Sequence, residues 1–365
     1  VMLSPGTRIG PHRVDSWLKE GATGQSYKGE RTEGEKKREL FYVKLLPREI
    51  SEKRGFEELF TQECQALEQV EGPGIWPLRK FGVMKWKHWL AYDWHPGKVV
   101  ELEVIGENAD NPDIEEVKSE QIYSLEDDLK FDPAPWKQSD LLDLMITLHR
   151  ALYQAHGNGF THGNLKPSNI LLTRENGKKL EAWITEFGLY RLVTMISQAK
   201  QEEGEVESMT TTLEAQASQN RSSEFRPHKQ GWGGSAEESW DLHALGKIAA
   251  EILSKMGGEE DRSDWLAWCS QATGEQPFES VAHSMDALPG VGDISQYGVR
   301  LEDGNEISDE ETERIRKRRE QEWLFEEKTS NLRFKRNMTG LVGGAVFADL
   351  FDQVHLFVLF SGTLD

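Results

Sequence analysis

The run Thr161–Leu172, with the sequence THGNLKPSNILL, constrains the fold of this chain more than any other stretch. Before it, apolar residues at helical spacing predict an amphipathic helix that begins near Ser139 and ends near Gly157. After its polar part, residues 170 to 172 are apolar and predict a short strand. A loop dense in His, Asn and Lys side chains therefore joins a helix to a strand, and it is the most informative segment of the sequence.

The first 98 residues have a pattern typical of β structure. Four short apolar or aromatic segments, separated by turn formers, predict strands at Trp17-Leu18, Ser26–Lys28, Leu40–Leu46 and Trp89–Tyr92. One helix interrupts them at about residues 55 to 70, where apolar side chains recur on a single face. Beyond residue 139 helical periods dominate, including a second clear helix at about 240 to 254. The sequence predicts a β-rich lobe at about 1–98 and a mainly helical lobe at about 99–295.

The run Thr161–Leu172 resembles the catalytic loop of protein kinases, in which His-Arg-Asp-Leu-Lys-Pro-x-Asn precedes an apolar strand. Other landmarks of that family follow in its order between residues 8 and about 290. They are a glycine turn at 18–27, a strand lysine, a helical glutamate, a hinge segment at 90–97 and an Asp-Phe-Gly-like segment at 184–189. The resemblance implies an α+β, bilobal protein-kinase-like fold, similar to that of bacterial Ser/Thr kinases.

The resemblance also implies which residues would form the site. Its nucleotide-binding positions are Gly21, Gly24, Lys44, Glu63, Tyr92 and Asp93; its catalytic-loop positions are Asn164 and Lys166; its metal positions are Asn169 and Glu186. In kinases the glycine turn and the strand lysine hold the phosphates of ATP, and the metal positions hold Mg²⁺. ATP and Mg²⁺ are therefore the cofactors that the resemblance implies, and Asp241 is expected to brace the backbone of the catalytic loop.

Several family positions carry other residues. Asn164 replaces the catalytic Asp, and an amide has no basic carboxylate to accept the proton of a substrate hydroxyl. Glu186 replaces the metal-binding Asp and extends the carboxylate by one methylene, which we expect to displace Mg²⁺ by about an ångström. Lys19 lies where the first glycine of the turn is expected, and Gly163 replaces an Arg that docks phosphorylated activation loops. The catalytic base is therefore absent, and metal binding is weakened.

Three functions agree with these departures. The first is a pseudokinase that binds ATP and signals by binding a partner protein. The second is a weak or atypical Ser/Thr kinase, because phosphoryl transfer depends mostly on positioning and electrostatics. The third is a scaffold that binds no nucleotide. Lys19 favours it, and so does Ser26, which lies where the family has an apolar residue that covers the base. The retained Lys44, Glu63 and Asn169 oppose it.

Charge and cysteine content narrow the class of partner. The chain of 365 residues has a formal net charge of −20, which opposes nucleic acid as a partner because phosphate backbones attract clustered cations. Its two cysteines, Cys64 and Cys269, cannot build a disulfide framework, which indicates a reducing compartment. The expected partners are ATP and an unidentified protein.

Three segments lie outside the predicted core. Residues 99–137 are acidic and rich in turn formers, and we interpret them as a surface insertion. Residues 296–336 predict a charged helical linker. Residues 338–360 have the length of a membrane span preceded by basic residues, but Asp349 and Asp352 oppose insertion. An anchor, a helix packed on the domain and an amphipathic tail therefore all remain open. The layout resembles bacterial single-pass kinases, which implies a cytoplasmic domain held at the inner membrane.

Overall fold

The fold is described from a computed structural model of the chain. It describes residues 2–21, 23–32, 39–52, 56–84, 87–94, 99–102, 119–131, 135–174, 179–189, 222–227, 237–257 and 260–301. The predicted linker beyond residue 301 and the candidate membrane span at 338–360 lie outside these residues. Within the described ranges, no helix combines the length and the apolar character needed to cross a bilayer.

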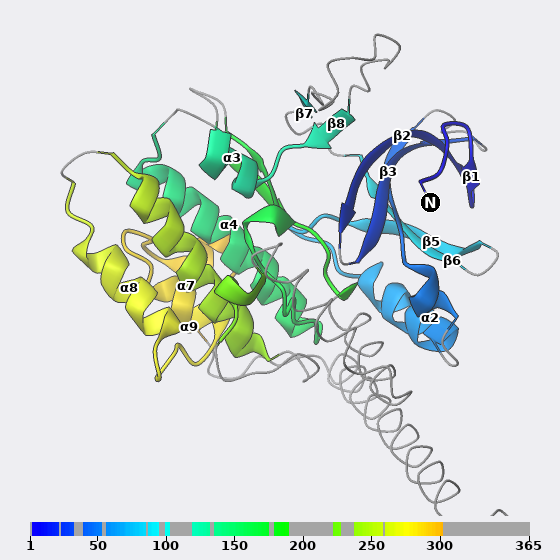
Figure 1. Cartoon of the computed structure of the whole chain (residues 1–365). Coiled ribbons are helices and arrows are strands. Elements are labelled where there is room, and N and C mark those ends of the chain that lie inside the picture. Colours follow the sequence, from blue (N-terminus) through cyan, green and yellow to red (C-terminus); the bar gives the residue numbers. More distant parts are fainter. Residues whose placement is uncertain are drawn as a thin grey trace, which may run out of the picture. The chain divides into compact units, whose positions relative to one another are not determined.

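The N-terminal lobe is an antiparallel sheet of six strands, seen on one side of Figure 1. Their order in space is β1-β2-β3-β4-β6-β5, and their bounds are β1 Arg8–Ile9, β2 His12–Gly21, β3 Gly24–Arg31, β4 Leu40–Leu45, β5 Leu78–Met84 and β6 Lys87–Asp93. Helix α2 (Phe56–Leu67), preceded by the short α1 (Arg48–Ser51), packs against the sheet through buried Phe60. The helix ends three residues before the predicted position, ahead of a turn that contains Gly72 and Gly74.

Strand β4 decides which side chains reach the centre of the molecule. Alternate residues of a strand point to opposite faces, so Phe41, Val43 and Leu45 share one face and pack into a small core inside the sheet. Tyr42 and Lys44 share the other face and are also buried, with 6% and 2% of their surface exposed. The sequence of this strand thereby places a cation and an aromatic ring together on the face opposite the small core.

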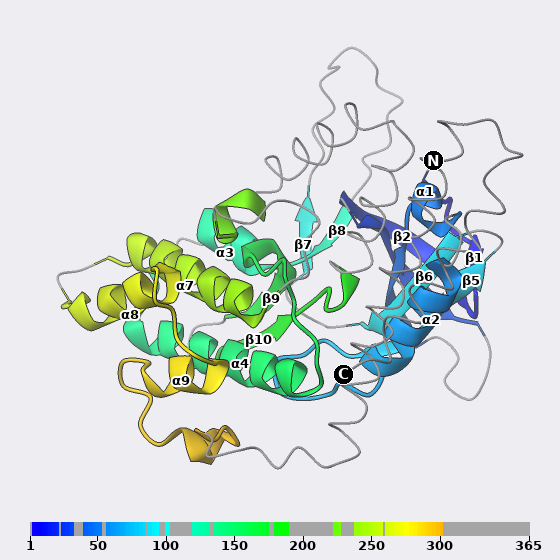
Figure 2. The ribbon, with the colours of Figure 1, turned by 90° about the horizontal axis from the view of Figure 1, so that it is seen from below.

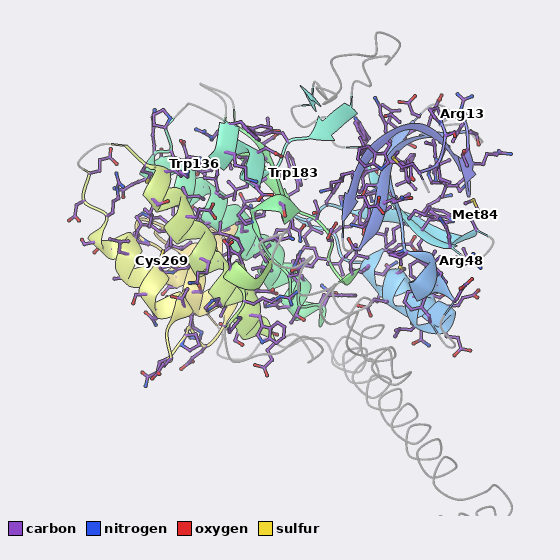
Figure 3. The ribbon with its side chains drawn as sticks, in the orientation of Figure 1. Arg13, Arg48, Met84, Trp136, Trp183 and Cys269 are labelled. Carbon is purple, nitrogen blue, oxygen red and sulfur yellow. The ribbon has the colours of Figure 1, made fainter. Side chains whose placement is uncertain are left out.

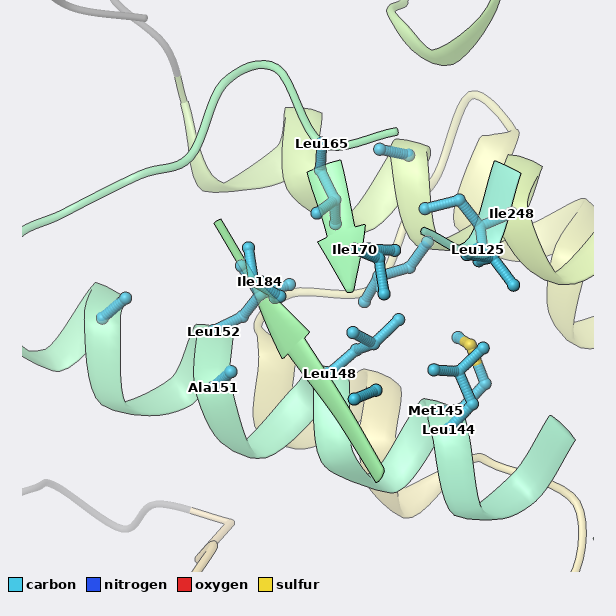
Figure 4. Packing of buried hydrophobic residues seen from close by; sticks show 14 of the residues in the cluster. Leu125, Leu144, Met145, Leu148, Ala151, Leu152, Leu165, Ile170, Ile184 and Ile248 are labelled. Carbon is cyan, nitrogen blue, oxygen red and sulfur yellow. The ribbon is translucent and has the colours of Figure 1, made fainter. Parts of the chain in front are cut away.

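The second lobe is mainly helical. Its elements are α3 Leu125–Phe131, α4 Gln138–Gly157, α7 Glu238–Lys255, α8 Ser263–Thr273 and α9 Val281–Asp286, with the single turns η1 Pro167–Asn169, η2 Ser222–Phe225 and η3 Ile294–Tyr297. Two antiparallel hairpins accompany them, β9 Ile170–Thr173 with β10 Glu181–Ile184, and β7 Val99–Leu102 with β8 Ser119–Ile122. Figure 2 shows the long helices gathered on the side away from the sheet. Helix α4 carries the apolar stripe that the sequence predicts, and Leu148 and Leu152 pack near Ile170 and Ile184 of the hairpin (Figure 4).

Part of the acidic segment 99–137 belongs to the core, which corrects its interpretation as a surface insertion. Leu125 and Leu129 of α3 and the following Trp136 are buried. The indole N–H of Trp136 (Figure 3) donates to Asp128 Oδ2 at 2.8 Å, and Arg174 Nη2 lies 3.0 Å from the same oxygen. The acidic composition of the segment concealed these few apolar residues, and the buried Asp128 is paired with a cation.

The two lobes are joined by a short backbone bridge. Ile75, which precedes β5, pairs with Ile184 at the end of β10. Trp76 N donates to Ile184 O at 3.1 Å, and Ile184 N donates to Gly74 O at 2.7 Å. This bridge fixes the segment before β5 next to the residues that follow β10.

Candidate functional site

A small cavity lies between the sheet and the β9–β10 hairpin. Its lining residues come from both lobes: Leu18, Lys19, Tyr42, Lys44, Trp76, Tyr92, Leu171, Thr185 and Glu186. The free space among them is about 20 Å³, which is room for one water molecule. Three residues that the sequence assigns to the site, Lys44, Tyr92 and Glu186, meet at this cavity.

An ion pair between Lys44 Nζ and Glu186 Oε1 dominates the electrostatics of the cavity. Burial alone would raise the pKa of Glu186, but the ammonium groups of Lys44, Lys19 and Lys166 outweigh it and lower that pKa to about 2. Thr23 Oγ1, from the glycine turn, lies 3.5 Å from both carboxylate oxygens. Glu186 is therefore ionised and in contact with the strand lysine and the glycine turn.

Glu186 also has an unusual backbone conformation. Its φ of 67° is the one positive value among the described residues other than glycine. A left-handed conformation costs an L-residue about 1–2 kcal/mol, so such positions persist where the surroundings enforce them and are frequent at functional sites.

Glu63, which the resemblance implies as the partner of the strand lysine, is buried on α2. Its Oε1 lies 3.4 Å from the position that a Cβ would take at Gly188, two residues beyond Glu186. The carboxylate that Lys44 binds is that of Glu186, whose side chain is one methylene longer than the expected aspartate.

The catalytic-loop backbone is held by a buried carboxylate. Asp241 of α7 accepts hydrogen bonds from His162 N and Gly163 N, each at 2.8 Å, and from His156 Nε2 at 2.8 Å. His162 Nδ1 accepts from Asn164 N at 3.2 Å, so its Nε2 carries the proton and donates to Thr185 O at 2.7 Å. Gly163, with a φ of 68°, takes this left-handed position without the strain that a side chain would add. The bracing role expected for Asp241 agrees with these bonds.

Asn164 is held from two sides. Its side-chain Oδ1 accepts from Arg226 Nη2 at 3.1 Å, and its backbone oxygen accepts from Asn169 Nδ2 at 3.0 Å. The position of a general base is thus taken by a neutral amide next to a guanidinium. Arg226 is a site residue that was not predictable from the sequence, because its place next to the loop depends on a contact between residues 62 positions apart.

Lys166 and Asn169 lie in or next to the single turn η1. Burial lowers the pKa of Lys166 to about 8; Glu186 opposes this effect, and the cations Lys19 and Arg226 add to it. The backbone oxygen of Asn169 accepts from both Thr185 N and Thr185 Oγ1, at 2.9 and 3.1 Å. Asn169 is therefore hydrogen-bonded to Thr185, the residue before Glu186.

The contacts of Gly24 and of the Asp93 side chain are with neighbouring parts of the sheet. Gly21 pairs with Gly24 across the β2–β3 turn, and Gly24 has a φ of 115° and packs directly on the backbone of Leu45 and Leu46. The carboxylate of Asp93 binds Arg79 Nη2 at 2.8 Å and is not among the residues that line the cavity. The backbone oxygen of Asp93 does contact a cavity residue, because it accepts a hydrogen bond from Trp76 Nε1 at 2.8 Å.

Two further cavity residues, Tyr42 and Trp76, were not identified from the sequence. Tyr42 lies with Lys44 on one face of β4, so the alternation of that strand carried a signal that could have located it. Trp76 lies in the bridge before β5, and no local pattern indicates that its indole turns toward Tyr92.

The donors for a divalent cation are few. Within the described ranges, no group of three or more His, Cys, Asp or Glu side chains comes together. An amide oxygen from Asn169 and a carboxylate oxygen from Glu186 are ligand types that suit Mg²⁺, which commonly takes one or two protein ligands and substrate phosphates. Because Lys44 already binds Glu186, a cation there competes with the ammonium group.

Comparison with known proteins gives one consistent result. A family model described as "Protein tyrosine and serine/threonine kinase" matches residues 13–224. The chain is 24% identical over 257 residues to serine/threonine-protein kinase pkn2 of Myxococcus xanthus, a match that covers 69% of this chain and 26% of that protein. It is 23% identical over 189 residues to serine/threonine-protein kinase PknH of Mycobacterium bovis, covering 52% of this chain and 26% of that protein. The chain thus spans about a quarter of the length of these relatives.

Solved structures show the same fold. The PknI kinase domain of Mycobacterium tuberculosis superposes with a TM-score of 0.51 at 14% identity, covering 81% of this chain and 100% of that domain. A double mutant of the same domain gives a TM-score of 0.52 at 15% identity, covering 81% and 99%. The curled antiparallel sheet and the helical second lobe are therefore those of a bilobal kinase fold, as the sequence predicts.

Proposed function

Because this chain belongs to the protein tyrosine and serine/threonine kinase family, we propose that it is a pseudokinase, which acts by binding a partner protein rather than by transferring phosphate. The observation that carries the proposal is Asn164. A general base needs a group that accepts a proton near neutral pH, and a carboxamide does not. Its oxygen also accepts a hydrogen bond from Arg226, so the group facing the loop at this point is cationic rather than basic.

Kinase folds generally bind ATP with Mg²⁺, and this chain retains several of the residues that would hold them. Gly21, Gly24, Lys44 and Glu63 occupy the nucleotide positions, and Asn169 with Glu186 would hold the cation. ATP would supply the phosphoryl group, and the cation would neutralise its charge. The ion pair between Lys44 and Glu186 opposes both ligands, since each must draw one partner away from the other.

A weak phosphotransferase is the second candidate. The curated relatives are named serine/threonine-protein kinases, and phosphoryl transfer relies mostly on positioning and electrostatics. Lys166, whose pKa is lowered to about 8, and Glu186 are among the charged groups that would serve such a reaction.

Transfer of labelled γ-phosphate decides between the two candidates. The chain is incubated with γ-labelled ATP and Mg²⁺ or Mn²⁺, alone and with a generic protein acceptor, beside the variant Lys44→Met. We expect the native chain to give no transfer above the Lys44→Met background. Transfer above that background would overturn the pseudokinase proposal and favour the second candidate.

A second experiment asks whether the replacements at positions 164 and 186 account for the expected absence of phosphoryl transfer. The double variant Asn164→Asp/Glu186→Asp restores a base and a shorter metal ligand, and Arg226→Gln added to it removes the guanidinium that would lower the pKa of the new carboxyl. We expect a higher rate of phosphate transfer in the triple variant than in the double variant. Transfer absent from both would place further defects elsewhere in the site.

We also propose that the kinase-like domain lies in the cytoplasm and that residues 338–360 anchor it to the inner membrane. The proposal is supported by the length of that segment and by the basic residues Arg333, Lys335 and Arg336 before it. Membrane fractionation of the full chain and of a chain ending at residue 336 tests it. Equal release of both by low salt would contradict the anchor.

A further inference from the structure

Three aromatic side chains form part of the cavity wall. Tyr42, Trp76 and Tyr92, called here the aromatic cluster, are each at most 6% exposed and all line the cavity. The rings of Trp76 and Tyr92 are stacked, with centroids 5.5 Å apart and planes 30° apart, and the ring of Tyr42 lies 4.8 Å from that of Trp76. Tyr42 is fixed at its hydroxyl, which donates to Ser26 Oγ at 2.6 Å. The cluster is therefore a packed and oriented group.

The indole of Trp76 makes the contacts that a flat heterocyclic ligand would need in this place. It stacks on Tyr92, and its N–H donates to the backbone oxygen of Asp93 at 2.8 Å. Asp93 ends β6, at the segment that leads from one lobe to the other. A purine base resembles an indole in that both are flat fused bicycles and both can donate an N–H hydrogen bond. Trp76 thus satisfies from inside the chain the stacking surface and the backbone acceptor that a base would use.

The free space among the lining residues is small. It is about 20 Å³, which is room for one water molecule, and a purine base is far larger than one water molecule. A nucleoside entering the cavity would have to displace a buried indole that is stacked and hydrogen-bonded. That displacement would leave the indole N–H of Trp76 without its hydrogen-bond acceptor or leave the ring of Tyr92 without its stacking partner, and either change costs free energy.

We propose that the indole of Trp76 takes the place of a flat heterocyclic ligand in this cavity, so that the native domain excludes nucleosides, and that removing this one ring opens the cavity to adenosine. Trp76 is thereby the residue that determines ligand specificity in this domain. The inference rests on the proposed function, because an active kinase must admit ATP. It goes further by assigning the exclusion to one side chain.

The experiment compares two Trp76 variants with a matched control. Trp76→Ala removes the ring completely, and Trp76→Leu retains part of the buried volume. Trp268→Ala is the control, because Trp268 is also buried, also donates its indole N–H to a backbone oxygen (Ser284, 2.9 Å) and also stacks on an aromatic ring (Phe278, 29° between planes). It lies on α8 and not at the cavity. The two tryptophans thus differ in position but hardly in their local contacts.

The readout is the melting temperature of the full chain with adenosine, and separately with ATP, together with equilibrium dialysis of labelled adenosine. We expect adenosine to leave the melting temperatures of the native chain and of Trp268→Ala unchanged. Adenosine should raise the melting temperature of Trp76→Ala by about 5 °C at a concentration 100-fold above its dissociation constant. Saturable dialysis should accompany that shift in the Trp76 variants alone.

Two results would overturn the proposal. One is saturable binding of adenosine by the native chain. The other is a Trp76 variant with the circular dichroism spectrum of the native chain that binds no adenosine. If neither Trp76 variant folds, dialysis on the native chain decides: binding overturns the proposal and no binding supports it. Failure of the two proposals can be told apart, since adenosine binding without γ-phosphate transfer removes only this inference, whereas transfer removes both.

Discussion

Gly24 shows how a residue of the glycine turn can be required by the fold itself. Its φ of 115° strains any other residue, and a Cβ there would overlap the backbone oxygen of Leu45 and approach Leu46 Cα to 3.1 Å. We expect Gly24→Ala to lower the free energy of unfolding by about 3 kcal/mol, from backbone strain and overpacking together. Urea unfolding followed by circular dichroism measures the change.

Gly157 provides the comparison for Gly24. It ends helix α4, and no atom lies within 4 Å of its Cβ position. Gly157→Ala should leave stability unchanged or raise it by up to about 1 kcal/mol. Equal effects of the two substitutions would show that the contact with Leu45 does not govern the turn.

The ion pair between Lys44 and Glu186 predicts a strong coupling between two residues. Lys44 is 2% exposed and the Glu186 side chain 16%, so removing one partner leaves a buried charge. We expect Lys44→Met to lower the free energy of unfolding by about 3 kcal/mol, and Glu186→Gln added to it to recover at least half of that loss. Additive effects in this double-mutant cycle would contradict the pair.

The same pair has a defined pH dependence. The folded-state pKa of Glu186 lies at about 2, below the ordinary value of 4.5 for a glutamate, so its contribution to stability is complete above pH 4.5. It is lost as the pH falls from 4.5 toward 2. The difference in unfolding free energy between the native chain and Glu186→Gln should therefore be constant above pH 5 and shrink in this range. A difference that grows on acidification would contradict the assignment.

At the scale of elements, helix α7 holds the catalytic loop through Asp241. Its two carboxylate oxygens accept three hydrogen bonds, two of them from the loop backbone. Asp241→Asn turns one acceptor into a donor that faces other donors, and we expect a loss of about 3 kcal/mol in unfolding free energy. Urea unfolding measures it, with Asp264→Asn in the exposed first turn of α8 as the control, which should change by no more than about 0.5 kcal/mol. Similar losses in both variants would contradict a bracing role.

Elements with a strong period were predictable from the sequence, and those with a mixed composition were not. The apolar stripe of α4 locates a helix that the structure bounds at Gln138–Gly157. Helix α3 escaped notice, because two buried leucines and a buried aspartate are set among exposed acids. The pairing of Lys44 with Glu186 also lay beyond the sequence, since it joins two residues that are 142 positions apart in the chain.

At the scale of the whole molecule, buried histidines predict acid sensitivity. Burial lowers the pKa of both His12 and His149 from 6.5 to about 4, and it lowers the pKa of His88 and His162. These side chains take up protons on unfolding, so stability is complete above pH 6.5 and falls as the pH drops toward 4. His12 and His149 together should give a slope of about 2.5 kcal/mol per pH unit near pH 5. Urea unfolding between pH 4.5 and 7 measures it.

His149→Gln separates one of these contributions. Its Nδ1 lies 2.6 Å from Met145 O and its Nε2 lies 3.0 Å from Ser284 Oγ, so the neutral ring is bonded at both nitrogens. The variant should lose about 1.2 kcal/mol per pH unit of the slope near pH 5, whereas His283→Gln, at an exposed position, should retain the whole slope. A slope unchanged in His149→Gln would assign the acid sensitivity to other groups.

The bilobal architecture was predictable because its motifs follow one another along the chain. The filling of the cavity was not, because Tyr42, Trp76 and Tyr92 come from three separate segments. Their meeting depends on the register of β4 with β6, which pairs Tyr42 with Tyr92, and on the turn that aims Trp76 between them. A sequence shows which rings exist, and tertiary packing decides which of them share a space.

The bridge between Ile75 and Ile184 links two cavity residues through the backbone. Trp76 directly follows Ile75, and Glu186 lies two residues beyond Ile184. Separating the two segments would break two backbone hydrogen bonds. The geometry of the cavity wall is thus set partly by main-chain atoms, which a side-chain substitution does not remove.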